Sequence, residues 1–74
     1  MKLIPLAEAQ EKYSTMFRGV KITIISGSVL FDEAGVDGAS SYYCREHTKQ
    51  LRFILGDGKY HCPDGDTVIS RVVG

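Results

Sequence analysis

The sequence contains little cysteine and no excess charge of either sign. Two cysteines, Cys44 and Cys62, are too few for the set of disulfides that stabilises many small secreted domains. Nine Lys and Arg residues balance nine Asp and Glu residues, which argues against a general binder of polyanions. We therefore expect a cytoplasmic protein with reduced thiols and without a cofactor.

Long apolar runs are also missing. The N-terminal apolar patch, residues 3–7, gives way at once to charged and polar residues and is shorter than the ~7–15 residues of a signal-peptide core. The longest apolar stretch elsewhere, residues 22–31, is interrupted by a threonine, a glycine and two serines. It falls short of the ~20 apolar residues that span a bilayer. We therefore expect no association with membranes.

The composition that remains is that of one small globular domain. The hydrophobic fraction is 43% and the charged fraction 24%, which excludes a disordered tail and a collagen-like repeat. Since domains seldom fall below ~40–50 residues, a chain of 74 residues has room for a single domain covering residues 1–74. A chain of this size buries a thin core.

The N-terminal segment has the pattern of a helix over residues 5–17. Its apolar residues recur at spacings of three and four and share one face: they are Leu6, Ala9, Tyr13, Met16 and Phe17. Pro5 suits the first helical turn, and Gly19 is a natural stop.

From Val20 onward the pattern changes to the alternation of β-strands, which predicts a β-meander over residues 20–73. Gly27-Ser28 predicts a tight hairpin that places Ile24 opposite Phe31. Asp57-Gly58 predicts a second two-residue hairpin, with Leu55 opposite Tyr60 and Phe53 opposite Cys62.

These elements predict an α+β fold. We expect the N-terminal helix to pack on a small, strongly bent antiparallel sheet of five or six strands, similar in shape to an SH3/OB-like half-barrel. The last strand, Thr67–Val73, is expected at an edge of the sheet. An exposed edge of this kind invites pairing with a second copy, which would give a homodimer.

Residues 32–41 have two glycines and three acidic side chains, and we expect a mobile acidic loop there. This loop supports the first functional hypothesis, a small non-enzymatic protein that binds stoichiometrically to a larger macromolecular partner. Phage-type inhibitors of host machinery are of this kind. The predicted contacts with a protein partner are Asp32, Glu33 and Asp37, with Tyr42 or Tyr43 as an exposed aromatic anchor.

The second hypothesis is a small barrel that binds nucleic acid. Four basic residues follow the loop and alternate with aromatic residues, as in proteins that bind single strands: Arg45, Lys49, Arg52 and Lys59. However, the hairpin places Phe53 and Tyr60 on the face opposite Arg52 and Lys59. The aromatic rings and the basic side chains would then not line one groove, and we expect a protein partner instead.

The third hypothesis is a zinc-stabilised interaction module. All cysteines and histidines occur within one short region and together form a Cys2His2 set: Cys44, His47, His61 and Cys62. His61 and Cys62 are adjacent, and neighbours on a strand point to opposite faces. We therefore expect free thiols instead of a metal site. The thiol and imidazole pairs lack an orienting motif, so we also expect no enzyme activity.

Overall fold

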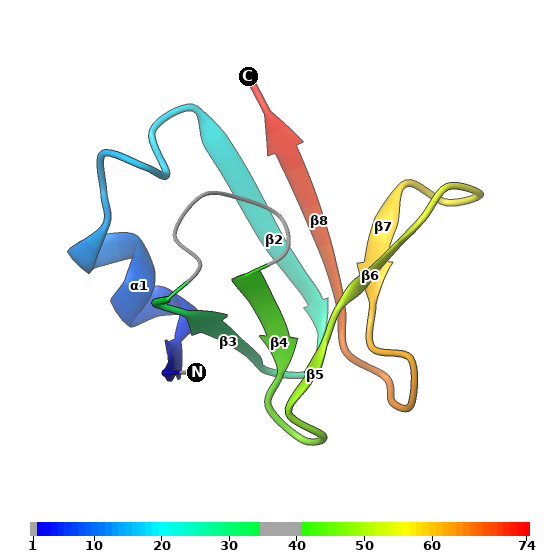
Figure 1. The fold of residues 1–74 in the computed structure, drawn as a ribbon. Helices are drawn as coiled ribbons and strands as arrows, with labels where there is room; N and C mark the ends of the chain where they lie inside the picture. The colour runs from blue at the N-terminus through cyan, green and yellow to red at the C-terminus, as the bar shows by residue number, and fades with distance from the viewer. Residues whose placement is uncertain (1, 35–40) are drawn as a thin grey trace.

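The computed structural model describes residues 2–34 and 41–74 (Figure 1). These residues form one helix, α1 (Leu6–Lys12), and eight strands: β1 (Leu3–Pro5), β2 (Val20–Ser26), β3 (Val29–Asp32), β4 (Tyr42–Cys44), β5 (Lys49–Gln50), β6 (Arg52–Ile54), β7 (Lys59–His61) and β8 (Val68–Val73). The predicted α+β class is confirmed. No helix among the described residues is long and apolar enough to cross a bilayer.

The strands form two antiparallel four-stranded sheets. One sheet has the order β1-β3-β4-β5 and the other the order β2-β8-β7-β6. Two segments pass directly from one sheet to the other, β2 to β3 through Gly27-Ser28 and β5 to β6 through Leu51. The eight strands exceed the expected five or six, and one of them, β1, precedes the helix and lies outside the predicted meander 20–73.

Gly27-Ser28 forms a corner between the sheets, so the predicted hairpin is wrong. β2 pairs with β8, which places Ile24 opposite Ile69, and β3 pairs with β1 and β4. Gly27 has φ 79°, and a Cβ there would lie 2.9 Å from the Cα of Thr67. Glycine is thus required for the chain to cross Thr67 at this corner.

The helix is shorter than the predicted 5–17. It ends at Lys12, because Tyr13 leaves the helical region with φ −114° and ψ 42°. Turns then lead to Gly19, whose φ is 79°. The predicted apolar face is still used, since Leu6 and Ala9 are buried from the helix and Phe17 from the turns that follow.

The core lies between α1 and the two sheets, with Phe31 at its centre. The ring of Phe31 is fully buried and lies 5.5 Å from the ring of Phe17, 5.7 Å from that of Tyr42 and 6.0 Å from that of Tyr13. The other buried apolar residues are Ile4, Leu6, Ala9, Val29, Cys44, Leu51, Cys62 and Ile69. Both cysteines therefore belong to the core, as buried thiols often do.

The β6–β7 hairpin has a longer loop than predicted. Phe53 pairs with Tyr60 and Ile54 with Lys59, so residues 55–58 form the loop and the predicted register is wrong by two residues. A shift of two keeps every side chain on its predicted face, since the period of a strand is two. The hairpin extends away from α1 (Figure 1), and Leu55 at its tip is 88% exposed.

Strand β8 is central, so the expectation of an exposed edge at Thr67–Val73 is wrong. β8 pairs with β2 on one side and with β7 on the other. The pairing with β7 covers Val68 and Ile69, while from Ser70 to Val73 the strand pairs with β2 alone. The outermost strands of this sheet are β2 and β6.

Candidate metal centre

Three potential metal ligands converge at one end of the two sheets. His47 Nδ1 lies 3.7 Å from the Sγ of Cys44 and 3.7 Å from the Sγ of Cys62. All three ligand atoms lie within 4.8 Å of one another. Ligands bound tetrahedrally to zinc at ~2.0–2.3 Å are separated by about 3.5–3.8 Å. The three atoms are therefore close to the spacing that one zinc ion requires.

Two turns bring these ligands together. Cys44 ends β4, and the turn that follows it carries His47 and closes with a 2.8 Å hydrogen bond from the Thr48 N–H to the Cys44 carbonyl. Cys62 follows β7, and its N–H donates to the Thr67 carbonyl at 2.9 Å, which closes the loop 63–66. The centre thus joins β4 of one sheet to the end of β7 in the other.

The environment of the two sulfurs differs. Burial acts to raise the pKa of Cys44, but the hydroxyl of Thr67 at 3.4 Å and the side chain and N–H of His47 bring it down to about 6. Burial raises the pKa of Cys62, the Asp64 N–H partly offsets this, and Cys44 raises it further. Cys44 is therefore the more acidic thiol of the pair, and its contact with His47 raises the pKa of that imidazole.

His61 lies outside this centre, as strand alternation predicts. Its Nε2 is 2.7 Å from the carboxylate of Asp57 in the hairpin loop, whereas the neighbouring Cys62 points into the core. Among the described residues the potential metal group therefore has three members, Cys44, His47 and Cys62, instead of four. Both thiols are free in the structure.

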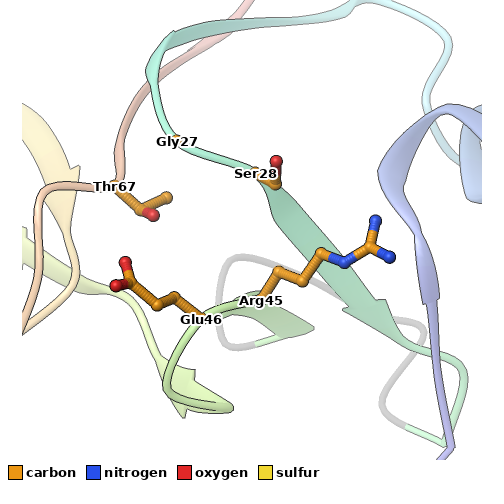
Figure 2. A pocket seen from close by; sticks show the side chains of 5 residues that line it. All are labelled: Gly27, Ser28, Arg45, Glu46 and Thr67. Atoms are coloured by element: carbon orange, nitrogen blue, oxygen red, sulfur yellow. The ribbon is translucent and has the colours of Figure 1, made fainter.

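A hollow of about 440 Å³ lies next to the centre. It is lined by Gly27, Ser28, Arg45, Glu46 and Thr67. Figure 2 shows the Glu46 carboxylate directed toward Thr67, while the guanidinium of Arg45 points away. Thr67 connects the hollow to the centre through its contact with Cys44.

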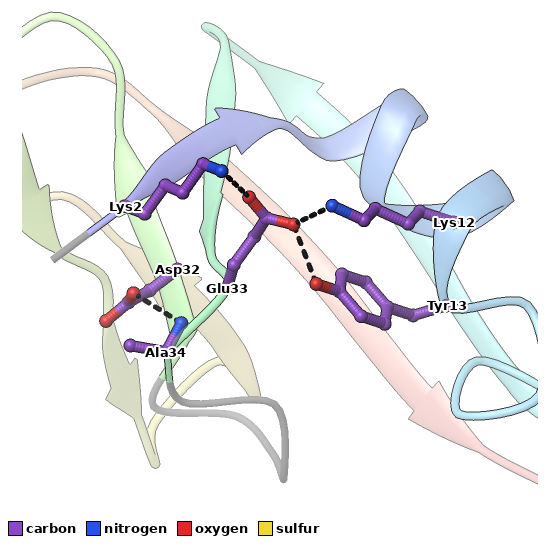
Figure 3. A network of polar contacts seen from close by, with 6 residues as sticks. All are labelled: Lys2, Lys12, Tyr13, Asp32, Glu33 and Ala34. Atoms are coloured by element: carbon purple, nitrogen blue, oxygen red, sulfur yellow. Dashed lines mark hydrogen bonds and ion pairs between the residues drawn. The ribbon is translucent and has the colours of Figure 1, made fainter.

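Two of the acidic residues predicted to contact a protein partner, Asp32 and Glu33, are engaged within the chain. Asp32 accepts a hydrogen bond from the Ala34 N–H at 3.0 Å. Glu33 lies 2.6 Å from Lys12 Nζ and 3.6 Å from Lys2 Nζ, and it accepts a 2.7 Å hydrogen bond from Tyr13 (Figure 3). Its side chain is only 8% exposed. These long-range contacts leave no signal in the local sequence.

The other residues of that prediction are placed differently from what was expected. Tyr42 is 2% exposed, so the expectation of an exposed ring is wrong. It pairs with Phe31 in the core because β4 lies between β3 and β5. Tyr43 is partly buried, and Asp37 lies outside the described residues.

Glu33 is expected to make the stability depend on pH in acid. The hydrogen bonds from Lys12 and Tyr13 hold the pKa of Glu33 at about 2, below the ~4.3 of an unfolded chain. A lowered pKa contributes stability above the unfolded value and loses it as the pH falls toward the folded value. Glu33→Gln should therefore have a lower urea midpoint than the wild type at pH 7. Near pH 2 the two midpoints should be almost the same. Exposed Glu11→Gln is the control, and an equal effect of both variants would contradict the role of Glu33.

The four basic residues predicted to bind nucleic acid lie in different parts of the structure. Lys49 is ion-paired with Asp64, and Arg45 lines the hollow beside the centre. Arg52 and Lys59 lie on one face of the β6–β7 hairpin, opposite the tilted ring pair of Phe53 and Tyr60. The four side chains therefore do not gather into one basic groove.

Arg52 and Lys59 belong to what we call the outer face, the side of the second sheet that is turned away from the buried Ile69. Strand register places these residues on it: Lys21, Thr23, Arg52, Ile54, Lys59, His61, Val68, Ser70 and Val72. Helix α1 packs on β1 and β3 of the other sheet. The outer face is thus open to solvent and contains three basic side chains.

No protein-family model, curated protein or solved structure matches this chain.

Proposed function

We propose that the protein is a zinc-stabilised interaction module that acts by binding, without catalysis. The observation that carries this proposal is the convergence of Cys44, His47 and Cys62. Two thiolates and an imidazole form a set of ligands that binds zinc in preference to harder cations. Both sulfurs are buried and accept backbone hydrogen bonds, from the N–H of His47 and of Asp64. Such hydrogen bonds orient metal ligands.

A metal ion here would compensate for the small core. Small domains commonly need a disulfide or a structural metal because burial alone supplies only ~3–5 kcal/mol. Zinc would bridge the turn after β4 and the end of β7, which lie in different sheets. The chain also passes between the sheets at Gly27 and Leu51, and this arrangement supports a half-barrel whose two sheets the metal would join.

The outer face is the surface that we assign to the partner. Lys21, Arg52 and Lys59 lie beside Ile54 and Val72, which are 44% and 57% exposed. Since no Phe or Tyr ring of the described residues lies on this face, it lacks the large stacking rings that bind single-stranded nucleic acid. Charge complementarity instead favours an acidic protein segment with interspersed apolar side chains.

One binding experiment tests both parts of this proposal. The probe is a fluorescent peptide of alternating Glu and Leu, measured by anisotropy against zinc-loaded protein, zinc-stripped protein and the triple variant Lys21→Glu, Arg52→Glu, Lys59→Glu. We expect one zinc per chain and peptide binding that falls by about tenfold or more, or ~1.4 kcal/mol, in the stripped and triple-variant samples. Arg18→Glu, in the exposed turns after α1, is the charge control and should bind like the wild type.

Two results would contradict the proposal separately. Less than about one zinc per four chains would exclude the metal, because a metal ion that stabilises the fold must be bound by most of the chains. Tighter binding of a single-stranded oligonucleotide than of the peptide would exclude the acidic protein partner in favour of nucleic acid.

A further inference from the structure

Strand β7 accompanies β8 over only part of its length. The residue pair of these two strands nearest the end of β8 is Tyr60 with Ile69, whereas β2 is paired with β8 as far as Val73. The β6–β7 hairpin leans away from the C-terminal half of β8 (Figure 1). Among the described strands, the stretch from Ser70 to Val73 therefore has a partner on one side only.

The free side of this stretch presents the backbone groups of Arg71 and Val73. The Gly74 N–H donates to the Gly19 carbonyl at 2.7 Å, so Gly74 faces the segment that leads into β2. Residues of an antiparallel strand direct their N–H and C=O groups to alternate sides. The even-numbered residues of β8 thus face β2 as well, and the N–H and C=O groups of Arg71 and Val73 point to the side from which β7 has diverged.

The side chains along this free edge are exposed. Val72 and Val73 are exposed on β8, and Phe53 and Leu55 are exposed on the β6–β7 hairpin. Natural edge strands are commonly protected from pairing by a proline, a bulge or lysines. From Ser70 to Val73 the chain has no proline or lysine, and its register with β2 is regular. The edge is therefore suited to pairing with an extended segment of another chain.

The charges around this edge indicate which segment fits. The outer face carries Lys21, Arg52 and Lys59 and no acidic side chain. A second copy that paired through the same edge would bring two such faces side by side in one sheet, and like charges on neighbouring strands are unfavourable. An acidic segment has the complementary charge.

We propose that the acidic segment of the partner binds as an additional antiparallel strand, paired with the backbone of Arg71 and Val73 on the free side of β8. This inference rests on the proposed function, and it states how the same partner is held. In such strand addition the main chain supplies affinity, and the side chains of alternate residues supply specificity. Antiparallel pairing continues the arrangement of the whole sheet.

The proposed pairing determines which N–H groups of the partner are needed. A residue opposite Arg71 or Val73 exchanges backbone hydrogen bonds with it and directs its side chain to the same face. That face is shared with the buried Ile69 and with Phe53, so it suits apolar side chains. In an alternating Glu-Leu peptide the Leu residues therefore donate to β8, while the Glu side chains lie on the side of the outer face and the Glu N–H groups point away.

The test compares three forms of this peptide by anisotropy with the wild-type protein in zinc-containing buffer: unmodified, N-methylated at every Leu, and N-methylated at every Glu. The two methylated peptides are matched, because they lose the same number of N–H groups. We expect the N-methyl-Leu peptide to bind about tenfold more weakly or worse, and the N-methyl-Glu peptide to bind within about threefold of the unmodified one.

Variants of Val73 test the same edge from the side of the protein. Val73→Pro removes an N–H from the free side only, and proline is tolerated at such edge positions. Val73→Ala retains the N–H and is the matched control for the lost side chain. The unmodified peptide should bind Val73→Pro about tenfold more weakly than Val73→Ala. Circular dichroism verifies that both variants are folded.

The outcomes separate this inference from the proposed function. Equal affinities for the two N-methylated peptides, or the reverse order, overturn the added strand and leave the outer face as the partner's surface. An unmodified peptide that does not bind overturns the proposed partner and this inference together. A protein that sediments as a dimer without peptide, and as a monomer after Val73→Pro, assigns the edge to a second copy and also overturns the inference. The peptide comparison decides the matter if Val73→Pro does not fold.

Discussion

His47→Ala is expected to release zinc and to lower the thermal midpoint, whereas His61→Ala should retain both. The two histidines make a matched pair, because His47 lies 3.7 Å from both sulfurs while His61 is bound to Asp57. Loss of one of three protein ligands should weaken zinc binding by about 100-fold or more, or ~2.7 kcal/mol. The whole stability of a domain of this size is only ~4–11 kcal/mol.

The exposure of His47 makes this variant informative. Its side chain contributes little to the core, so a loss of stability in His47→Ala would arise from the metal and not from packing. Zinc affinity is measured by competition with a chromophoric chelator, and thermal midpoints by circular dichroism with and without EDTA. EDTA should destabilise the wild type and His61→Ala but leave His47→Ala almost unchanged. A wild type that is indifferent to EDTA would falsify a structural role for zinc.

The second large effect is expected for Phe31→Ala, which should leave the chain largely unfolded at 37 °C. Phe31 is fully buried and packs against the rings of Tyr13, Phe17 and Tyr42, so its removal creates a cavity where α1 meets the sheets. Phe→Ala substitutions in cores cost ~3–5 kcal/mol. This cost approaches the total of ~4–11 kcal/mol for a domain of this size.

Phe53→Ala is the matched control for this substitution. The ring of Phe53 is 51% exposed on the β6–β7 hairpin and pairs with Tyr60 at 5.1 Å. An aromatic pair contributes ~0.5–1.5 kcal/mol, so this variant should remain folded. Urea denaturation of both zinc-loaded variants provides the comparison. Similar midpoints for the two would show that Phe31 is not the centre of the core.

The features that the sequence predicts correctly are those that depend on local geometry. The alternation of side chains separates Phe53 and Tyr60 from Arg52 and Lys59, and it separates His61 from Cys62. It does so even though the predicted hairpin register is wrong by two residues, because a shift of two leaves every face unchanged. The apolar spacing of Leu6 and Ala9 likewise identifies the buried side of α1.

The convergence of the metal ligands is only partly contained in the sequence. Cys44 and His47 have a spacing that one turn can bring together, and this part could be anticipated. Cys62 reaches them because β4 and β7 belong to two sheets that come together at this end. No local sequence pattern predicts this contact between the sheets. The close approach of Gly65 to the ring of His47 has the same origin, since the two residues come from different turns.

By itself, therefore, the sequence of this protein determined its class, the beginning of its helix, and the two faces of the β6–β7 hairpin. Only the tertiary structure decided that Gly27-Ser28 is a corner instead of a hairpin, that β8 is central, and that Glu33 is enclosed by Lys2, Lys12 and Tyr13. The physical reason is the range of the interactions. Alternation and helical spacing follow from covalent geometry over a few residues, whereas strand order and ion pairing depend on which distant segments bury their surfaces together.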